Sequence, residues 1–396
     1  MKERGITLIA LVVSIIVLLI LAGISISMLT GQNGILNRAQ EAKDKTSEAQ
    51  EDENKKIQNY VEMINRYAEN LPIGEGTTPY IPNSTFSYKE GDLSTGLVIE
   101  DSDNNEYVWV EVPTTIYENT VYNSNGTKKP SNSEDYANIE ACLKAYTSDY
   151  SDSSYSDTNS DFATQYQAML KSVYTNGGFW IGRYEAGIDE KTPRIGHIDI
   201  TSNDKIVIKS NMIPYNYVTM SEAQILATRM NYDGITSSLI FGIQWDLILK
   251  YIENKNITAK ANLTSDSTTI GNYYNSEFIL SRGKFAQHYN LENWYNFNSD
   301  KKNDLVNECE KKAQESDSNA ILLTTGATES TKLQNIYDIA GNVWEWTLEF
   351  YNNDLPCVLR GGSYASEGKG SLIKGHSNAD ISGAYDNIGF RIGLWK

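Results

Sequence analysis

Residues 335–350 read NIYDIAGNVWEWTLEF, and this stretch decides how the C-terminal part of the chain is expected to fold. Its aromatic pair, Trp344 and Trp346, alternates with Glu345. Successive side chains of an extended segment point to opposite sides, so the two indoles would face one side and the carboxylate the other. The stretch therefore predicts a strand with one aromatic face and a charged group behind it.

Two shorter motifs follow, LRGGSY at residues 359–364 and NIGFRIGL at residues 387–394. In the first motif, Gly361 and Gly362 come directly after Arg360. Glycine adopts positive φ without steric cost and lets another backbone approach closely. We therefore expect a tight turn or a close backbone contact after Arg360.

The motifs GNVWEW, RGGSY and GFR, in this order, resemble the signature of the sulfatase-modifying, formylglycine-generating-enzyme family, a branch of the C-type lectin fold. The upstream segments LVIEDSDNNEYVWVEV, GGFWIGRYEAG, PYNYVTMSEAQ and SSLIFGIQWDLIL fall in the expected order, so the resemblance covers about residues 90–396. It implies an α+β, C-type-lectin-like domain with little regular structure, built from short antiparallel strands and two helices. Arg391 would be buried and hydrogen-bonded rather than in contact with a ligand. The structural signature comprises Trp344, Trp346, Arg360, Gly361, Gly362, Phe390 and Arg391.

The local patterns between the linker and the motifs are those of a mixed α and β domain. Residues 97–112 read as a β-hairpin around a polar turn, and residues 177–188 as a strand. Helical spacing appears at 221–230 and 241–254. The candidate N-terminal caps of these two helices are Ser221 and Thr236 to Ser238.

The N-terminal segment is strongly apolar. Residues 6–28 read ITLIALVVSIIVLLILAGISISM, carry no charge, and would form a helix about 35 Å long. That length crosses the hydrocarbon core of a bilayer. Lys2 and Arg4 precede the segment, so the N-terminus is expected in the cytoplasm and the remainder outside. The sequence thus predicts a single-pass protein of the cell membrane.

The segment KERGITLIALVVSIIVLLILAG also resembles the leader and first helix of type IV prepilins, in which a peptidase cuts after a glycine. Here that cut would fall between Gly5 and Ile6. Many pilins carry Glu at the fifth mature position, whereas this chain has Ala10, so anchoring is better supported than filament assembly. Cleavage by ordinary signal peptidase is the alternative, but no clear small-x-small site is present.

Composition shifts divide the rest of the chain. A stretch rich in Ala, Glu, Lys and Gln follows the apolar segment and is typical of a polar helix. A cluster of Pro and Gly then marks a linker. The expected organisation is a leader at 1–5, a transmembrane helix at 6–30, a helical stalk at 31–71, a linker at 72–88, and a domain at 89–396 with an insertion at about 114–175.

Charge and cysteine content exclude some classes of protein. The chain has 34 Lys plus Arg against 51 Asp plus Glu, a formal charge of −17, and no basic stripe that could neutralise phosphates. Nucleic-acid binding is therefore not expected. Cys142, Cys309 and Cys357 make an odd count, which argues against a dense disulfide framework. One bridge with a leftover thiol and three thiols both remain open.

The cysteine positions also bear on catalysis. The resembled enzymes oxidise a peptide cysteine with copper held by two thiolates, which lie between the RGGSY and GFR motifs. Here residues 365–388 contain no Cys, and Cys357 lies outside them. Related iron enzymes need a His cluster, but His197, His288 and His376 are widely separated. Neither copper nor iron is expected, and a binding protein is favoured over an enzyme that uses an unrecognised site.

The segment before GFR is the predicted ligand surface. The same fold branch includes the variable proteins of diversity-generating retroelements, in which this stretch is rewritten to retarget binding. Residues 364–387 hold many residue types reachable from Asn codons, although Lys369, Lys374 and Glu367 are not, and a polar loop of no special origin fits equally well. Tyr364, Tyr385 and His376 are the predicted large anchors. The full predicted set is Tyr364, Ser366, Lys369, Lys374, His376, Asn378, Asp380, Tyr385 and Asp386.

These observations predict an adhesin-like display protein that binds a protein or glycan on another cell or surface. The alternative is a minor pilin whose C-terminal domain is a tip or assembly module, with other pilins as partners. The resemblance also implies a structural calcium ion at Glu345 with carbonyls around Gly341 and Val343, hard oxygen ligands for a hard cation. A desolvated carboxylate opposite two buried indoles would need such a partner.

Overall fold

The chain divides into two compact units, Met1–Pro72 and Ile73–Lys396. In the first unit, residues 11–21 are helical and expose their apolar side chains. Within the described parts of the chain, no helix is both long and apolar enough to cross a membrane. The expected cleavage site at Gly5 and Ile6 and nearly all of the expected stalk lie outside the described residues. The computed structural model describes residues 11–21, 43, 45–46, 79–117, 130–157, 160–188, 192–230, 232–296, 306–307 and 310–396.

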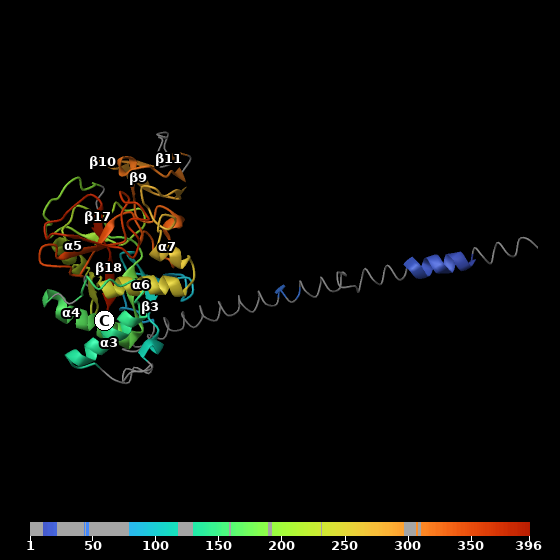
Figure 1. Ribbon diagram of the computed structural model, residues 1–396, viewed down its shortest axis with the longest axis horizontal. Coiled ribbons are helices and arrows are strands. Elements are labelled where there is room, and N and C mark those ends of the chain that lie inside the picture. Colours follow the sequence, from blue (N-terminus) through green and yellow to red (C-terminus); the bar gives the residue numbers. More distant parts are fainter. Residues whose placement is uncertain are drawn as a thin grey trace, which may run out of the picture. The chain divides into compact units, whose positions relative to one another are not determined.

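The second unit is a mixed α/β domain built around a six-stranded antiparallel sheet (Figure 1). The C-terminal strand is inserted between strands from the middle of the chain, so it joins both halves of the sheet. Trp109, Trp180 and Trp395 lie almost fully buried against this sheet. The strand order is β1 (Ser87–Glu90), β2 (Val98–Glu100), β3 (Glu106–Glu111), β4 (Gly178–Gly182), β18 (Ile392–Trp395) and β7 (Thr236–Leu239).

The expected hairpin and helices are present, and two caps differ from prediction. Strands β2 and β3 pair antiparallel, and the two predicted helices are α5 (Met220–Thr228) and α6 (Gly242–Asn254). The cap of α5 is Thr219, not Ser221, in a reciprocal capping box with Glu222. Residues 236–239 form strand β7 instead of a cap.

The cap of α6 comes from a distant segment. The backbone N–H groups of Gly242 and Ile243 donate to the two carboxylate oxygens of Asp157, at 2.7 and 3.0 Å. These groups are among the N–H groups that a helix cannot satisfy by itself. Local sequence around α6 holds no sign of this cap, because its acceptor lies in the predicted insertion.

The predicted insertion packs as part of the domain body. It contains η1 (Thr114–Tyr117), α3 (Ser133–Tyr146), η2 (Ser160–Phe162) and α4 (Ala163–Asn176). Helix α4 contacts strands β4 and β18, and Ser156 forms a backbone bridge to Phe350. Its polar composition therefore does not make it a loose loop.

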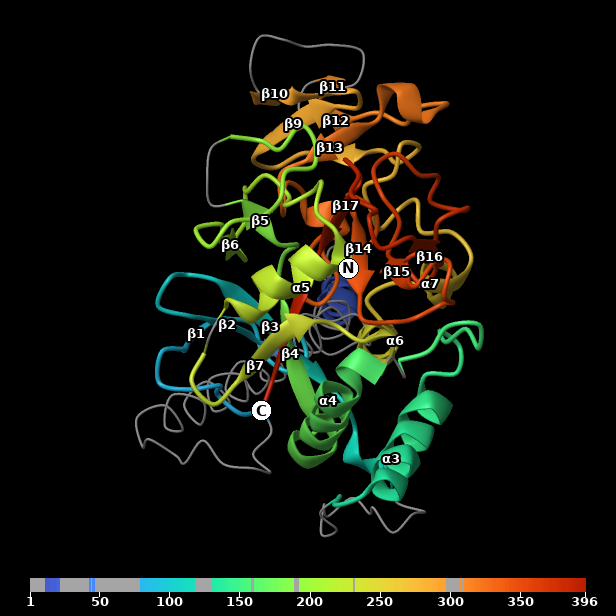
Figure 2. The ribbon, with the colours of Figure 1, turned by 90° about the vertical axis from the view of Figure 1, so that its left-hand side faces the viewer.

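A second, four-stranded sheet carries the three sequence motifs. Its order is β16 (His376–Ala379), β15 (Cys357–Arg360), β14 (Trp344–Thr347) and β17 (Ile388–Phe390), with β14 and β17 parallel and the other pairs antiparallel. Figure 2 places small sheets at one end of the domain and α3 with α4 at the other. The remaining elements are β5 (Gly187–Ile188), β6 (Ile206–Val207), α7 (Lys260–Thr264), β8 (Phe278–Ile279), β9 (Lys284–Gln287), β10 (Asn290–Asn296), β11 (Val306–Asn307), β12 (Glu310–Lys311), η3 (Asp317–Asn319), β13 (Ile321–Leu323) and η4 (Glu329–Thr331).

Candidate functional site

The four-stranded sheet has two chemically different faces. Its register places Glu345 opposite Arg360, and Arg360 opposite His376. One residue along, Trp346 lies opposite Leu359. Because side chains alternate between the faces of a strand, the ionisable groups share one face and the tryptophans share the other.

The charged face is buried and held by a network around Arg360. The Arg360 guanidinium is fully buried, with Nη2 2.6 Å from Asp246 Oδ1 and Nη1 3.1 Å from Glu349 Oε1. His376 Nε2 lies 2.7 Å from Arg360 Nη1 and 3.2 Å from Glu349 Oε1. The His376 ring also stacks on Tyr155, with 4.2 Å between ring centroids. These contacts correct the expectation that His376 is an exposed ligand anchor.

Two carboxyl groups beside this network have opposite pKa shifts. Burial, followed by the charge of Glu349, raises the pKa of Asp157 to about 8. Burial also acts against ionisation of Glu349, but Arg360 and His376 outweigh it and lower the pKa of Glu349 to about 2. At neutral pH, Glu349 is therefore ionised, whereas Asp157 largely keeps its proton.

Arg391 is at the centre of a second buried cluster. Its Nη2 lies 2.8 Å from Glu345 Oε1, and its Nη1 donates to the Gly182 carbonyl at 2.8 Å. Arg391 is fully buried, as the family resemblance implies. The Glu345 carboxylate therefore already has an ionic partner, Arg391, inside the protein. Burial of Glu345 alone does not require a calcium ion as its partner.

The Arg391 cluster still holds more acid than base. Glu185 and Asp338 are buried with Glu345, and burial raises the pKa of all three carboxyl groups. Glu185 accepts hydrogen bonds from Asn342 Nδ2 at 2.6 Å and from the Val343 N–H at 3.1 Å. These two hydrogen bonds offset part of the free-energy cost of burying the Glu185 carboxyl group. Calcium at Glu345 stays a prediction.

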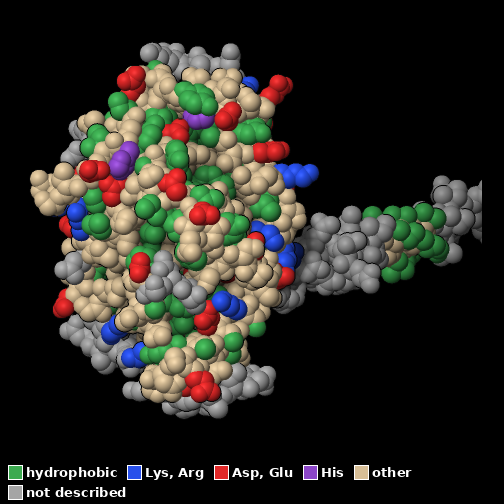
Figure 3. Space-filling view, turned by 60° about the vertical axis from the view of Figure 1, so that its left-hand side comes forward, with side chains coloured by type: hydrophobic (Ala, Val, Ile, Leu, Met, Phe, Trp, Pro, Cys, Tyr) green, Lys and Arg blue, Asp and Glu red, His purple; other side chains and the backbone are tan. Residues whose placement is uncertain are grey.

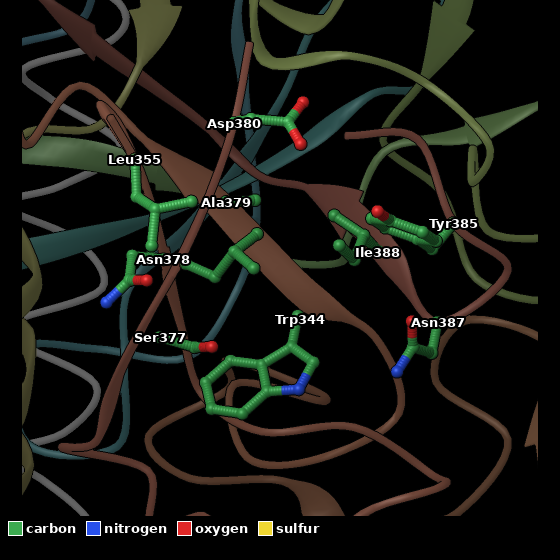
Figure 4. A pocket seen from close by; sticks show the side chains of 10 residues that line it. Trp344, Leu355, Ser377, Asn378, Ala379, Asp380, Tyr385, Asn387 and Ile388 are labelled. Carbon is green, nitrogen blue, oxygen red and sulfur yellow. The ribbon is translucent and has the colours of Figure 1, made fainter. Parts of the chain in front are cut away.

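The tryptophan face opens at one end into a cavity of about 330 Å³. Trp346 is fully buried and donates from Nε1 to the Val218 carbonyl at 2.9 Å. Trp344 is only half-buried and lines the cavity, so the expectation of two buried indoles is wrong for Trp344. Figure 4 shows Ile388 between the Trp344 and Tyr385 side chains. The lining residues are Trp344, Leu355, Leu359, Ser377, Asn378, Ala379, Asp380, Tyr385, Asn387 and Ile388.

Three residues of the predicted ligand surface line this cavity. They are Asn378, Asp380 and Tyr385, and the Tyr385 side chain is 52% exposed. The Asn378 amide is turned towards Tyr155, to whose hydroxyl it donates at 3.4 Å. Sequence reasoning assigned Trp344 a structural role only. Trp344 is the first of two alternating tryptophans, and its position at the end of strand β14 is the signal that could have identified it.

Tyr364 is buried and Asp386 is partly buried, and neither lines the cavity. Tyr364 is fully buried, and its hydroxyl donates to Asp386 Oδ2 at 2.7 Å, which corrects the expectation of an exposed anchor. His288 Nε2 lies 3.3 Å from the same carboxylate oxygen, and the His288 ring stacks on Tyr289. Burial acts against ionisation of Asp386, but His288 and Tyr364 outweigh it and lower the pKa of Asp386. Asp386 therefore fixes the turn that presents Tyr385.

The other predicted surface residues do not line the cavity. Ser366 Oγ lies 3.0 Å from Ser363 Oγ, and Lys374 Nζ donates to the Asp149 carbonyl at 3.3 Å. Lys369 is exposed.

Gly362 has a φ of 82°, and a Cβ at this position would lie 2.6 Å from the Ser371 carbonyl oxygen. This close approach is the backbone contact expected after Arg360.

No pair of described cysteines forms a metal site. Cys142 and Cys357 are both thiols, and Cys309 lies outside the described residues. Burial, followed by the charge of Asp380, raises the pKa of Cys357 to about 11. A thiol that stays protonated at neutral pH is a poor metal ligand.

Among the described residues, one group of three could supply ligands to a metal ion. His197, Asp199 and Glu222 bring ligand atoms within 4.8 Å of one another at the surface. Glu222 also accepts from the Thr219 hydroxyl at 2.9 Å and from the Ile200 N–H at 3.1 Å. Its carboxylate therefore already serves to cap α5 and to hold the preceding loop.

The surface in Figure 3 carries acidic and basic side chains scattered among apolar ones. On this face, Lys and Arg side chains do not gather into a continuous stripe. A basic stripe is the usual electrostatic footprint of nucleic-acid binding.

Comparison with known proteins finds a family match for the region that carries the motifs. Residues 270–393, which include every residue that lines the cavity, match the family described as sulfatase-modifying factor enzyme 1-like domain. Among solved structures, the chain is similar to Treponema denticola variable protein 1, with a TM-score of 0.31 and 13% identity over 56% of this chain and 85% of that one. It is also similar to a structure titled crystal structure of CarF, with a TM-score of 0.33 and 14% identity over 55% of this chain and 87% of that one. A search of curated proteins finds no match.

Proposed function

We propose, from the family match over residues 270–393 and the geometry of the four-stranded sheet, that the chain is an adhesin-like ligand-binding protein of the cell surface. The cavity beside Trp344 and Tyr385 is its binding site. The observation that carries this proposal is an open aromatic cavity on one face of a sheet whose other face is locked by buried ion pairs. Ligand sites are commonly concave and apolar, with a few polar groups at fixed positions.

The lining chemistry favours binding over the oxidation carried out by the resembled enzymes. The residues that line the cavity include no Cys and no His, the side chains that would hold copper or iron. The thiol on the same sheet, Cys357, is buried and has a pKa of about 11. These observations support a binding role for this cavity over oxidation of a peptide cysteine.

The predicted variable segment supplies more than half of this site. Six of the ten lining residues come from residues 364–387, namely Ser377, Asn378, Ala379, Asp380, Tyr385 and Asn387. The other lining residues come from β14, β15, β17 and the loops next to them. A variable segment carried on rigid strands can change its ligand without loss of the fold. This supports a diversified binding surface within residues 364–387.

The proposal includes membrane attachment through residues 6–28, because that apolar run is long enough to span a bilayer. The C-terminal domain would then face outward, and a ligand on another cell or surface would reach it. The prepilin-like leader supports a second candidate, attachment to a surface filament with other pilins. Processing at Gly5 distinguishes these two modes of attachment.

Binding is tested with the full chain in detergent on arrays of peptides and glycans. The double variant Trp344→Ala, Tyr385→Ala should lose the array signals, because it removes both exposed aromatic walls of the cavity. Tyr289→Ala is the matched control, since Tyr289 is 78% exposed but does not line the cavity. Thermal melts show whether both variants stay folded. Array signals that survive the double variant, or an array without any bound ligand, would overturn the proposed site.

A further inference from the structure

The cavity that forms the proposed binding site is lined by an acidic side chain and by no basic one. Of its ten lining residues, Asp380 alone is ionisable near neutral pH, and no Lys, Arg or His lines the wall. Asp380 Oδ1 accepts from the Ser382 N–H at 2.8 Å and from the Ser382 hydroxyl at 2.6 Å. These two hydrogen bonds lower the pKa of the carboxyl group. Asp380 makes no ion pair with any basic residue that the structure describes.

Two aromatic rings line the same cavity as this carboxylate. The Trp344 indole is half-buried, and the Tyr385 ring is 52% exposed. In Figure 4 the two rings lie on adjoining sides, with the Asp380 carboxylate at the opposite rim from Trp344. The faces of aromatic rings attract cations, and Trp does so most strongly. The two rings and the Asp380 carboxylate therefore both favour a positively charged group on the ligand.

The rest of the wall suits an apolar stem. Leu355, Leu359 and Ile388 contribute aliphatic surface next to the rings. Long basic side chains bury their methylene groups along apolar surface and keep the charged head near polar groups. A cavity of about 330 Å³ is at the small end of ligand sites, so it would hold one side chain and not a folded segment.

We propose that this cavity takes the side chain of an Arg or Lys residue presented by a partner protein. The stem packs against Leu359 and Ile388, and the cationic head lies between the two aromatic rings and Asp380. An anionic group would face the unpaired carboxylate, and a neutral sugar would leave that carboxylate without a counter-charge. The chain's formal charge of −17 also attracts a basic partner. This inference rests on the proposed function and narrows the class of its ligand.

The test follows Trp344 directly in the full chain. The seven tryptophans are labelled with 5-fluorotryptophan, and the Trp344 signal in the fluorine NMR spectrum is identified by its loss in Trp344→Phe. N-acetyl-arginine methylamide is titrated against N-acetyl-citrulline methylamide, which has nearly the same shape but no charge. The arginine probe should shift the Trp344 signal in a saturable way and bind roughly three- to thirtyfold more tightly than the citrulline probe.

Matched variants separate the charge from the fold. Asp380→Asn should weaken binding of the arginine probe, whereas Asp354→Asn, which removes an exposed carboxylate outside the cavity, should not. Equal affinity for both probes, no shift with the arginine probe, or no effect of Asp380→Asn would overturn the cationic ligand. If array ligands still need Trp344 in that case, the binding site stands and only its ligand class is wrong. If no array ligand binds, the proposed function fails as well.

Discussion

Asp157 and Glu349 are two buried acids with opposite pKa shifts, so at neutral pH Asp157 largely keeps its proton and Glu349 is ionised. The unfolded chain would release that proton near the ordinary pKa of 3.8. Because the folded state binds more protons between these values, its free energy of unfolding falls as the pH rises from about 4 to 8. Glu349 acts in the opposite direction, and its contribution is lost as the pH falls from about 4.5 towards 2.

The first prediction concerns this pH dependence. Asp157→Asn should flatten the decline in unfolding free energy between pH 4 and 8, a decline of at most about 5 kcal/mol for a shift of this size. The variant loses one hydrogen bond at the start of α6, so the slope and not the absolute stability is the readout. Chemical denaturation at several pH values measures the slope, with Asp354→Asn as control. An unchanged slope would show that Asp157 is ionised in the folded protein.

The second prediction concerns Glu345 and calcium. Glu345→Gln breaks the buried ion pair with Arg391, so it should cost about 3 to 5 kcal/mol of unfolding free energy. If calcium also binds there, adding it after chelation should raise the melting temperature of the wild-type chain by mass action, but not that of the variant. If calcium does not change the melting temperature of the wild-type chain, the role of Glu345 is limited to its ion pair with Arg391.

At the scale of elements, strand β16 separates buried positions from cavity-lining positions within residues 364–387. His376 faces the buried network, whereas Ser377 faces the cavity. The third prediction is that His376→Ala costs about 2 kcal/mol or more, because it removes a buried polar partner and a stacked ring. Ser377→Ala should stay within about 0.5 kcal/mol. Urea denaturation of the two variants compares them, and equal stabilities would contradict the assignment of faces.

Local patterns were sufficient for some elements and not for others. The spacing of apolar residues located α5 and α6, since a helical period is a property of neighbouring residues. Tyr364 and His376 were misplaced because their partners, Asp386 and Glu349, are brought to them by strand pairing. A polar segment between two motifs resembles a surface loop until its register is known. Long-range pairing, and not composition, decided which of its residues are buried.

At the scale of the whole molecule, the proposed membrane attachment depends on the apolar segment 6–28. The fourth prediction is that carbonate extraction of membranes leaves the full-length protein in the pellet, because this segment is long enough to cross the bilayer. Release of protein that still carries residues 6–28 would contradict this anchor. Gly5→Leu should block removal of the leader if a prepilin peptidase acts. Identical N-termini in the wild type and in the variant would remove the pilin interpretation.

The position of β18 in the central sheet determines when the domain can be completed. This strand, Ile392–Trp395, pairs with β4 on one side and with β7 on the other. Until residues 392–395 have been synthesised, β4 and β7 lack the neighbour that joins them. A nascent chain therefore leaves the ribosome with its largest sheet in two separate parts, although domains can usually begin to fold during synthesis. If the chain is exported, it can be threaded through a translocation channel before the six-stranded sheet is complete.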